Sequence, residues 1–135
     1  MRITSSILAA ALLLGATPML ASERSTRAAA KLERALEGRV AGAPVDCIQL
    51  RSIRSSQIID RTAILYEAGN GTIYVNRPEG GASSLDKWDI LVTDTHSSRL
   101  CSIDVVRLYD SGARMPTGFV SLGEFVPYKK AASEK

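Results

Sequence analysis

The sequence predicts a mainly β protein of the α+β class: a small antiparallel barrel or sandwich of about five or six strands with one N-terminal helix. Three observations predict this fold. The chain has 135 residues, the length of one domain. Apolar and polar residues alternate over much of its second half, as they do in half-buried strands. The connections between these runs are short and carry no helical pattern, which argues against a parallel α/β fold.

The first segment, residues 1–21, has the pattern of a signal peptide. Arg2 gives it a positive start, Ile7–Ala16 is almost wholly apolar, and Pro18 precedes the small residues Ala21 and Ser22. We place the cleavage after Ala21, and cleavage after Ser22 is the alternative. The apolar run is about half of the roughly 20 residues that a membrane-spanning helix needs. We therefore expect an exported protein, periplasmic or secreted, with no membrane span after cleavage. The alternative is a buried N-terminal helix.

The next unit, residues 22–46, is expected to contain a helix and a linker. An amphipathic helix is predicted over residues 25–37, with Ser25 or Thr26 as its cap and Gly38 after its end. Its apolar stripe consists of Ala28, Leu32, Ala35 and Leu36, and it should lie against a sheet edge or face. Residues 38–46 contain two Gly and one Pro and are expected to be a linker.

A β domain over residues 47–128 is expected to follow. Residues 62–66 alternate as a strand does, Gly69–Gly71 is a strong turn signal, and residues 72–76 form the second strand of a hairpin. A third strand is expected to bury one face made of Trp88, Ile90 and Val92.

Two longer strands complete this expected domain. After a polar turn at residues 95–99, residues 100–109 read as one strand, and a change of apolar phase predicts a bulge near Val105–Val106. Residues 119–126 read as the last strand, which Pro127 ends. Residues 129–135 are then expected to be a flexible tail.

The two cysteines, Cys47 and Cys101, fit an exported protein. Disulfides persist in oxidising compartments, and two cysteines allow a single intramolecular pairing. The alternatives are two buried free thiols or a redox pair, although a redox pair normally lies in a short Cys-x-x-Cys segment.

Composition excludes several classes of function. Removal of residues 1–21 takes away one Arg and no acid, which leaves a net charge of +2 and no dense basic run of the kind that nucleic-acid binding shows. An ordinary zinc site needs about four ligands, and only three Cys and His residues exist. We therefore assign no metal, no cofactor and no nucleic-acid partner.

The sequence contains no convergent catalytic signature. His96 is the only histidine, and Asp94 and Ser97 beside it would point apart in a turn, so this segment reads as a solvated hairpin turn. Asp104 alternates with apolar residues and reads as one half of a structural ion pair with Arg107 or Arg61, or as a catalytic acid.

Arginine outnumbers lysine in the mature chain, eleven to five. Arg51, Arg54 and Arg61 surround the first strand of the predicted hairpin. They would form a patch for an acidic or sugar-bearing ligand together with Tyr74, Asn76 and Arg77. Ordinary surface ion pairs are the alternative.

Four segments carry a resemblance to a known family: Cys47-Ile48, Tyr74–Pro78, the Leu-Cys-x-x-Asp segment at residues 100–104 and residues 122–128. In this order they resemble small exported bacterial proteins classed as a domain of unknown function. The resemblance implies export and a disulfide but no reaction. The family often has Gly directly before its Asp, where this chain has Ile103.

These observations lead to two hypotheses of function, beside a third in which the protein has a purely structural role, such as a stability or assembly factor. The first is a non-enzymatic envelope or periplasmic module that binds an envelope protein or an acidic or sugar-bearing ligand, with Tyr74, Asn76, Arg77 and Asp104 as candidate ligand-binding residues and no catalytic residue. The alternative is a small hydrolase of envelope material that uses Asp104 with a nearby Arg or Tyr.

Overall fold

The computed structural model describes residues 19–132 of the chain. Over these residues it consists of one α-helix, α1 (Met19–Ala35), and ten strands in three antiparallel sheets that do not close into a barrel. The mainly β fold with one helix is confirmed. The predicted signal peptide lies outside the described residues, except that Met19–Ala21 form the first residues of α1. None of the helical residues between 19 and 132 forms a segment long and apolar enough to cross a bilayer.

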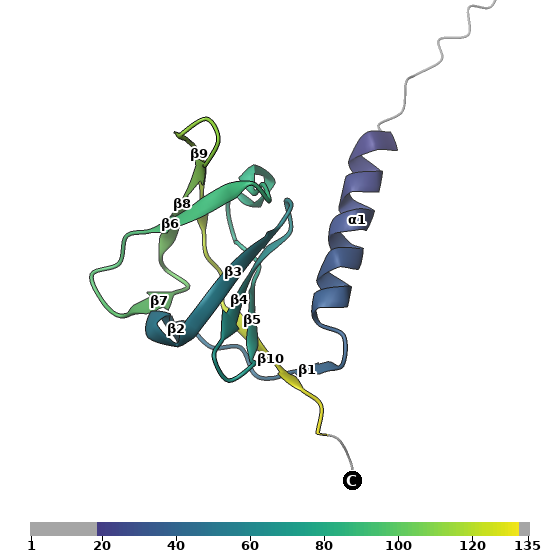
Figure 1. Cartoon of the computed structure of the whole chain (residues 1–135), viewed down its shortest axis with the longest axis vertical. Helices are drawn as coiled ribbons and strands as arrows, with labels where there is room; N and C mark the ends of the chain where they lie inside the picture. The colour runs from purple at the N-terminus through teal and green to yellow at the C-terminus, as the bar shows by residue number, and fades with distance from the viewer. Residues whose placement is uncertain (1–18, 133–135) are drawn as a thin grey trace, which may run out of the picture.

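The largest sheet has five strands and separates the helix from the two smaller sheets (Figure 1). Its strand order is β1 (Arg39–Ala41), β10 (Phe125–Lys130), β5 (Ile73–Asn76), β4 (Ala63–Ala68) and β3 (Ile53–Ile59). The smaller sheets are β2 (Cys47–Gln49) with β7 (Arg99–Cys101), and β6 (Asp89–Thr93) with β8 (Val105–Asp110) and β9 (Met115–Ser121). Two short 3-10 helices are η1 (Leu50–Ser52) and η2 (Ala82–Ser84).

The five-stranded sheet is buried on both faces because its strands alternate between two apolar cores. Ile64 and Tyr66 of β4 belong to the larger core, which the smaller sheets cover. Ala63 and Leu65 of the same strand belong to the second core, which α1 covers. Successive side chains of a strand point to opposite faces, so this single strand contributes to both cores.

Helix α1 docks on the sheet through the stripe that the sequence predicts. Ala28 and Leu32 are buried, and Ala35 and Leu36 are partly buried against the second core. The helix begins at Met19, so the expected caps Ser25 and Thr26 lie inside it, and the Thr26 hydroxyl donates to the Ser22 carbonyl. The capping prediction is therefore wrong for the chain as described.

The predicted hairpin is confirmed, since β4 pairs with β5 across the turn at Gly69–Gly71. The predicted inner face of the third strand is wrong. Trp88, Ile90 and Val92 are exposed, and Leu91 packs against the larger core. Cross-strand pairing places Leu91 opposite the buried Leu108, and this contact fixes which face of β6 points inward.

The expected strand at residues 100–109 is divided into β7 and β8 by a turn. The Asp104 amide donates to the Cys101 carbonyl, and Ile103 in this turn is 86% exposed. The change of apolar phase in the sequence near Val105–Val106 therefore comes from this turn, and the predicted bulge at that position is wrong. The register shift lies further on in the pairing of β8 with β9, where Leu108 pairs with Gly118 and Tyr109 with Pro116, so that the extra residue is Thr117 of β9.

The predicted linker and tail also form strands. Residues 39–41 of the linker form β1, which pairs with the last residues of β10, so that Lys129 and Lys130 belong to the sheet. Pro127 does not end the strand. Its carbonyl oxygen accepts a hydrogen bond from the Gly42 amide. In an antiparallel sheet the N and O of one residue point to the same neighbouring strand, so the N–H that proline lacks would point to the same side as this carbonyl, just beyond the end of β1. The proline therefore removes no hydrogen bond of the β1–β10 pairing.

The predicted disulfide joins Cys47 of β2 to Cys101 of β7, residues that lie directly opposite each other. The Cys101 amide donates to a carboxylate oxygen of Asp104 at 2.7 Å, and the Ser102 amide donates to the Asp46 carbonyl at 2.8 Å. The crosslink thus joins the two strands of this small sheet, with hydrogen bonds beside it.

Removal of the crosslink should lower stability. The two cysteines are 54 residues apart, so the Cys47→Ala/Cys101→Ala variant removes a closed loop of this length from the unfolded chain. The gain in chain entropy of the unfolded state should lower the free energy of unfolding by about 4 kcal/mol. Urea unfolding followed by circular dichroism should show a lower midpoint for this variant than for the oxidised protein. Equal midpoints would show that the crosslink adds nothing to the folded state.

Candidate functional site

Asn76, predicted as a ligand-binding residue, is fully buried and holds two backbone segments together. Its amide nitrogen donates to the Gly123 carbonyl at 2.6 Å, and its carbonyl oxygen accepts from the Gly123 amide at 3.1 Å. A Cβ at position 123 would lie only 2.5 Å from the Arg77 carbonyl oxygen, so glycine allows this close approach. Asn76 therefore has a structural role in this fold.

The arginine patch predicted around the first hairpin strand is only partly assembled. Arg51 and Arg54 line an open cavity of about 470 Å³ together with Tyr74, beside Cys47. Arg61 lies at the β3–β4 turn and lines a different cavity, and the exposed Arg77 lines neither of the two. The structure thus joins three of the six predicted residues.

Asp104 and His96 do not form a shared site. One Asp104 carboxylate oxygen accepts from the Cys101 amide, so its partner is a backbone group and not the expected Arg61 or Arg107. Arg107 instead lies 3.6 Å from Asp94. His96 is in an exposed loop, but this loop joins strands of two different sheets and is not a hairpin.

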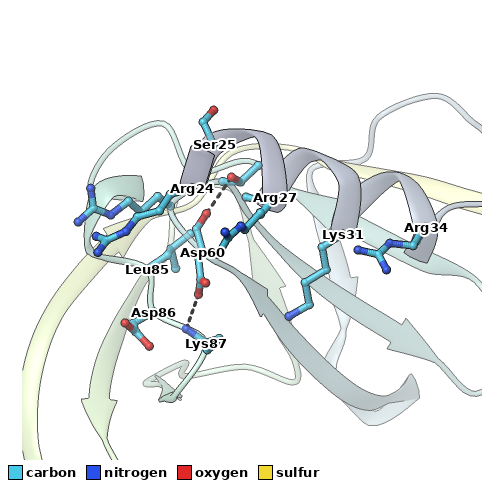
Figure 2. Close-up of a pocket in the computed structure, with 12 residues that line it drawn as sticks. Arg24, Ser25, Arg27, Lys31, Arg34, Asp60, Leu85, Asp86 and Lys87 are labelled. Carbon is cyan, nitrogen blue, oxygen red and sulfur yellow. Dashed lines mark hydrogen bonds between the residues drawn. The ribbon is translucent and has the colours of Figure 1, made fainter. Parts of the chain in front are cut away.

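The strongest candidate site is a cavity of about 640 Å³ between α1, the β3–β4 turn and the segment after η2 (Figure 2). We call this cavity the basic groove. Six cationic side chains and only two carboxylates line it. The cations are Arg24, Arg27, Lys31, Arg34, Arg61 and Lys87, and the acids are Asp60 and Asp86. Within residues 19–132, none of these cations lies within ion-pair distance of a carboxylate.

Both carboxylates of the basic groove are engaged by backbone amides. The Asp60 carboxylate accepts from the Lys87 amide at 2.7 Å, a bond drawn in Figure 2, and the Asp86 carboxylate accepts from the Trp88 amide at 2.9 Å. The first bond holds the segment that carries Lys87 against the β3–β4 turn, and the second shapes the turn within that segment. The acids therefore shape the groove, while its cations face solvent.

The helix contributes four of the six cations from one side. Arg24, Arg27, Lys31 and Arg34 follow the spacing i, i+3, i+7 and i+10, which places them in one row along a helix. This spacing is visible in the sequence and could have identified the row. The additions of Arg61 and Lys87 depend on the fold, because they come from two other segments of the chain.

Lys87 also connects the basic groove to the only tryptophan of the chain. Its ammonium nitrogen lies 5.1 Å from the centre of the Trp88 ring, and Trp88 is 70% exposed. Cation–π contacts of this kind are worth about 0.5–1 kcal/mol at exposed sites, so an anion can recruit Lys87 at small cost. Trp88 therefore provides an intrinsic fluorescence signal for occupation of the groove.

Two further features concern possible chemistry. Tyr66 lies in the larger core edge-to-face with Phe125, burial raises the pKa of its hydroxyl, and the hydroxyl has no hydrogen-bond partner among the described residues. Over residues 19–132, no three His, Cys, Asp or Glu side chains lie close enough to hold a metal ion. The cations of the basic groove can attract anions and donate hydrogen bonds to them.

Comparisons of the chain with protein-family models, with curated proteins and with solved structures yield no match.

The structural role of Asn76 predicts a specific loss of stability. Asn76→Ala should leave the buried amide and carbonyl of Gly123 without partners and lower the free energy of unfolding by about 1–3 kcal/mol. Arg77→Ala, which removes an exposed side chain next to it, should change stability by less than about 0.5 kcal/mol. Chemical unfolding measures both, and equal stabilities of the two variants would contradict the structural role.

Proposed function

We propose that this protein is an exported, non-enzymatic binding module whose basic groove holds an anionic ligand of the bacterial envelope. The observation that carries the proposal is the excess of six cations over two carboxylates around one cavity, with both carboxylates engaged by backbone amides. Unpaired cations at a concave surface attract anions, and a guanidinium group binds phosphate or carboxylate with two parallel hydrogen bonds.

The dimensions of the basic groove support a ligand with several acidic groups. The helix row extends from Arg24 to Arg34, which corresponds to about 15 Å along the helix at about 1.5 Å per residue. A single phosphate is too small to contact this whole row. The favoured ligand class is therefore an envelope molecule that carries repeated phosphate or carboxylate groups, such as an acidic glycan.

Export remains part of this proposal. Cleavage after Ala21 would leave the helix from Ser22 onward, and every residue that lines the basic groove follows this position. The disulfide supports the same compartment, since crosslinks of this kind persist where thiols are oxidised.

The groove should lose affinity when helix cations are removed. Arg27→Ala/Lys31→Ala should weaken binding of polyphosphate and polygalacturonate about tenfold or more and reduce the salt dependence of binding, because fewer counterions are released. Titration followed by Trp88 fluorescence at several salt concentrations measures both effects. Neutral dextran should not bind.

The matched control is Arg51→Ala/Arg54→Ala, which removes the same charge from the second cavity. This control should bind both polyanions as the wild type does. If it loses as much affinity as the groove variant, attraction by net charge alone explains binding and the groove is not the site. If the wild-type protein binds neither polyanion, the proposed function is wrong.

Export makes its own prediction. The chain expressed with its full N-terminus in a Gram-negative host should be found in the periplasm, and its intact mass should correspond to a start at Ser22 and an oxidised cysteine pair. A full-length chain in the cytosol with two alkylatable thiols would contradict it.

A further inference from the structure

The outward side of the three-stranded sheet β6–β8–β9 carries an apolar surface that nothing in the described chain covers. Six side chains form it, and we call them the outer face: Ile90 and Val92 of β6, Val105, Arg107 and Tyr109 of β8, and Phe119 of β9. Their neighbours Leu91, Val106, Leu108 and Val120 point the other way, into the larger core.

Four apolar side chains of the outer face are exposed to solvent. Phe119 is 62% exposed, Ile90 51%, Val105 48% and Val92 38%. Cross-strand pairing brings Val92, Arg107 and Phe119 into one row and Ile90 and Tyr109 into the next. Contiguous apolar surface of this kind marks an interaction site, whereas scattered apolar residues do not.

The composition of the outer face favours a protein partner over a lipid surface. Aromatic residues and Arg are enriched in the centres of protein interfaces, and Lys and Glu are depleted there. The six residues include one Phe, one Tyr and one Arg but no Lys or Glu. Binding to anionic lipid needs an excess of cations, and the single cation Arg107 lies 3.6 Å from Asp94.

The charges of this surface fit a second copy of the same chain. Arg107 and Asp94 are 62% and 74% exposed and of opposite sign. A two-fold axis that passes between Arg107 and Asp94 places each Arg107 opposite the Asp94 of the other copy. The pair is therefore complementary to itself.

The area is also sufficient for a dimer. A fully exposed aromatic side chain presents about 150–250 Å², and Ile and Val present less, so the six partly exposed residues offer roughly 600 Å² at most on one copy. Two copies would bury about 1,200 Å² in total, the lower end of the range of specific interfaces. We propose that the protein forms a two-fold symmetric dimer through the outer face of β6–β8–β9, with Phe119 as its most exposed apolar side chain and Arg107–Asp94 pairs across the interface.

This dimer leaves the basic groove accessible. The outer face lies on the side of the small sheet away from the larger core, and α1 lies beyond the five-stranded sheet on the other side of that core (Figure 1). A dimer therefore presents two grooves, and a polyanion long enough to reach both would bind more tightly than to one. The dimer itself does not depend on the proposed ligand.

The test is the mass of the oxidised mature protein in solution, measured by sedimentation equilibrium from about 1 to 200 μM. The wild type should show a concentration-dependent approach to twice the monomer mass. Phe119→Asp should remain monomeric or weaken dimerisation at least tenfold. Val40→Asp, at a position on β1 that is 61% exposed and far from this sheet, is the matched control and should dimerise as the wild type does.

The charge pair gives a second test that does not depend on one bulky residue. Asp94→Arg and Arg107→Asp should each weaken the dimer, because each places like charges opposite each other, and the double variant should restore it. Circular dichroism confirms that each variant is folded, and Val92→Asp replaces Phe119→Asp if the latter fails to fold. A folded wild type that stays monomeric over the whole range overturns the proposal, as does a Phe119→Asp variant that dimerises normally.

Discussion

The alternation of apolar side chains in β4 is the constraint on which the rest of the structure depends. This strand contributes Ile64 and Tyr66 to one core and Ala63 and Leu65 to the other, so that both cores share one sheet. A shift of pairing by one residue would exchange the two faces and mismatch both cores at once. The register of β4 between β3 and β5 is therefore fixed from both sides. The position of α1, and with it one wall of the basic groove, follows from this register because the helix docks only on the second core.

The smaller sheets are held in place by polar and covalent contacts as well as by the larger core. The disulfide joins β2 to β7, the Asp104 carboxylate accepts from the Cys101 amide in the turn after β7, and Asn76 joins the end of β5 to the segment between β9 and β10. A third contact lies at Gly81, which has a φ of 78° and a Cβ position that would overlap the Phe119 carbonyl. There the Glu79–Gly81 segment runs along β9, and the Ser121 amide donates to the Gly80 carbonyl. These contacts use residues whose sequence context looks functional, namely an Asn and an Asp near aromatics and a Gly-Gly pair. In this protein they stabilise the fold.

Local patterns in the sequence identify those parts of the fold that depend on local interactions. The helix stripe and the hairpin at Gly69–Gly71 are of this kind, and the structure has both. The disulfide joins residues 54 apart and was predictable for another reason, because two cysteines allow a single pairing. The edge strand β3 escapes detection because Arg54, Ser55, Ser56 and Gln57 are exposed in succession and do not alternate. The inner face of β6 is assigned wrongly because Ile90 and Val92 have the stronger apolar pattern, while a single contact of Leu91 with the core decides the orientation.

The basic groove could be predicted only as far as the row on α1, since Arg61 and Lys87 join it through tertiary contacts.

The wrong assignment of β6 and the outer face have the same physical cause. Alternation in a sequence reports which face of a strand is apolar, but it does not distinguish burial within one chain from burial between chains. In β6 both faces are apolar, because Leu91 packs against the core while Ile90 and Val92 remain exposed. A strand that only needed one buried face would carry polar residues at positions 90 and 92, as β3 does at its exposed positions. An apolar outer side on β6, repeated by Val105 on β8 and Phe119 on β9, is therefore best explained by contact with another protein surface. The two proposed surfaces thus differ in kind: the basic groove offers cations to a charged ligand, and the outer face offers apolar area.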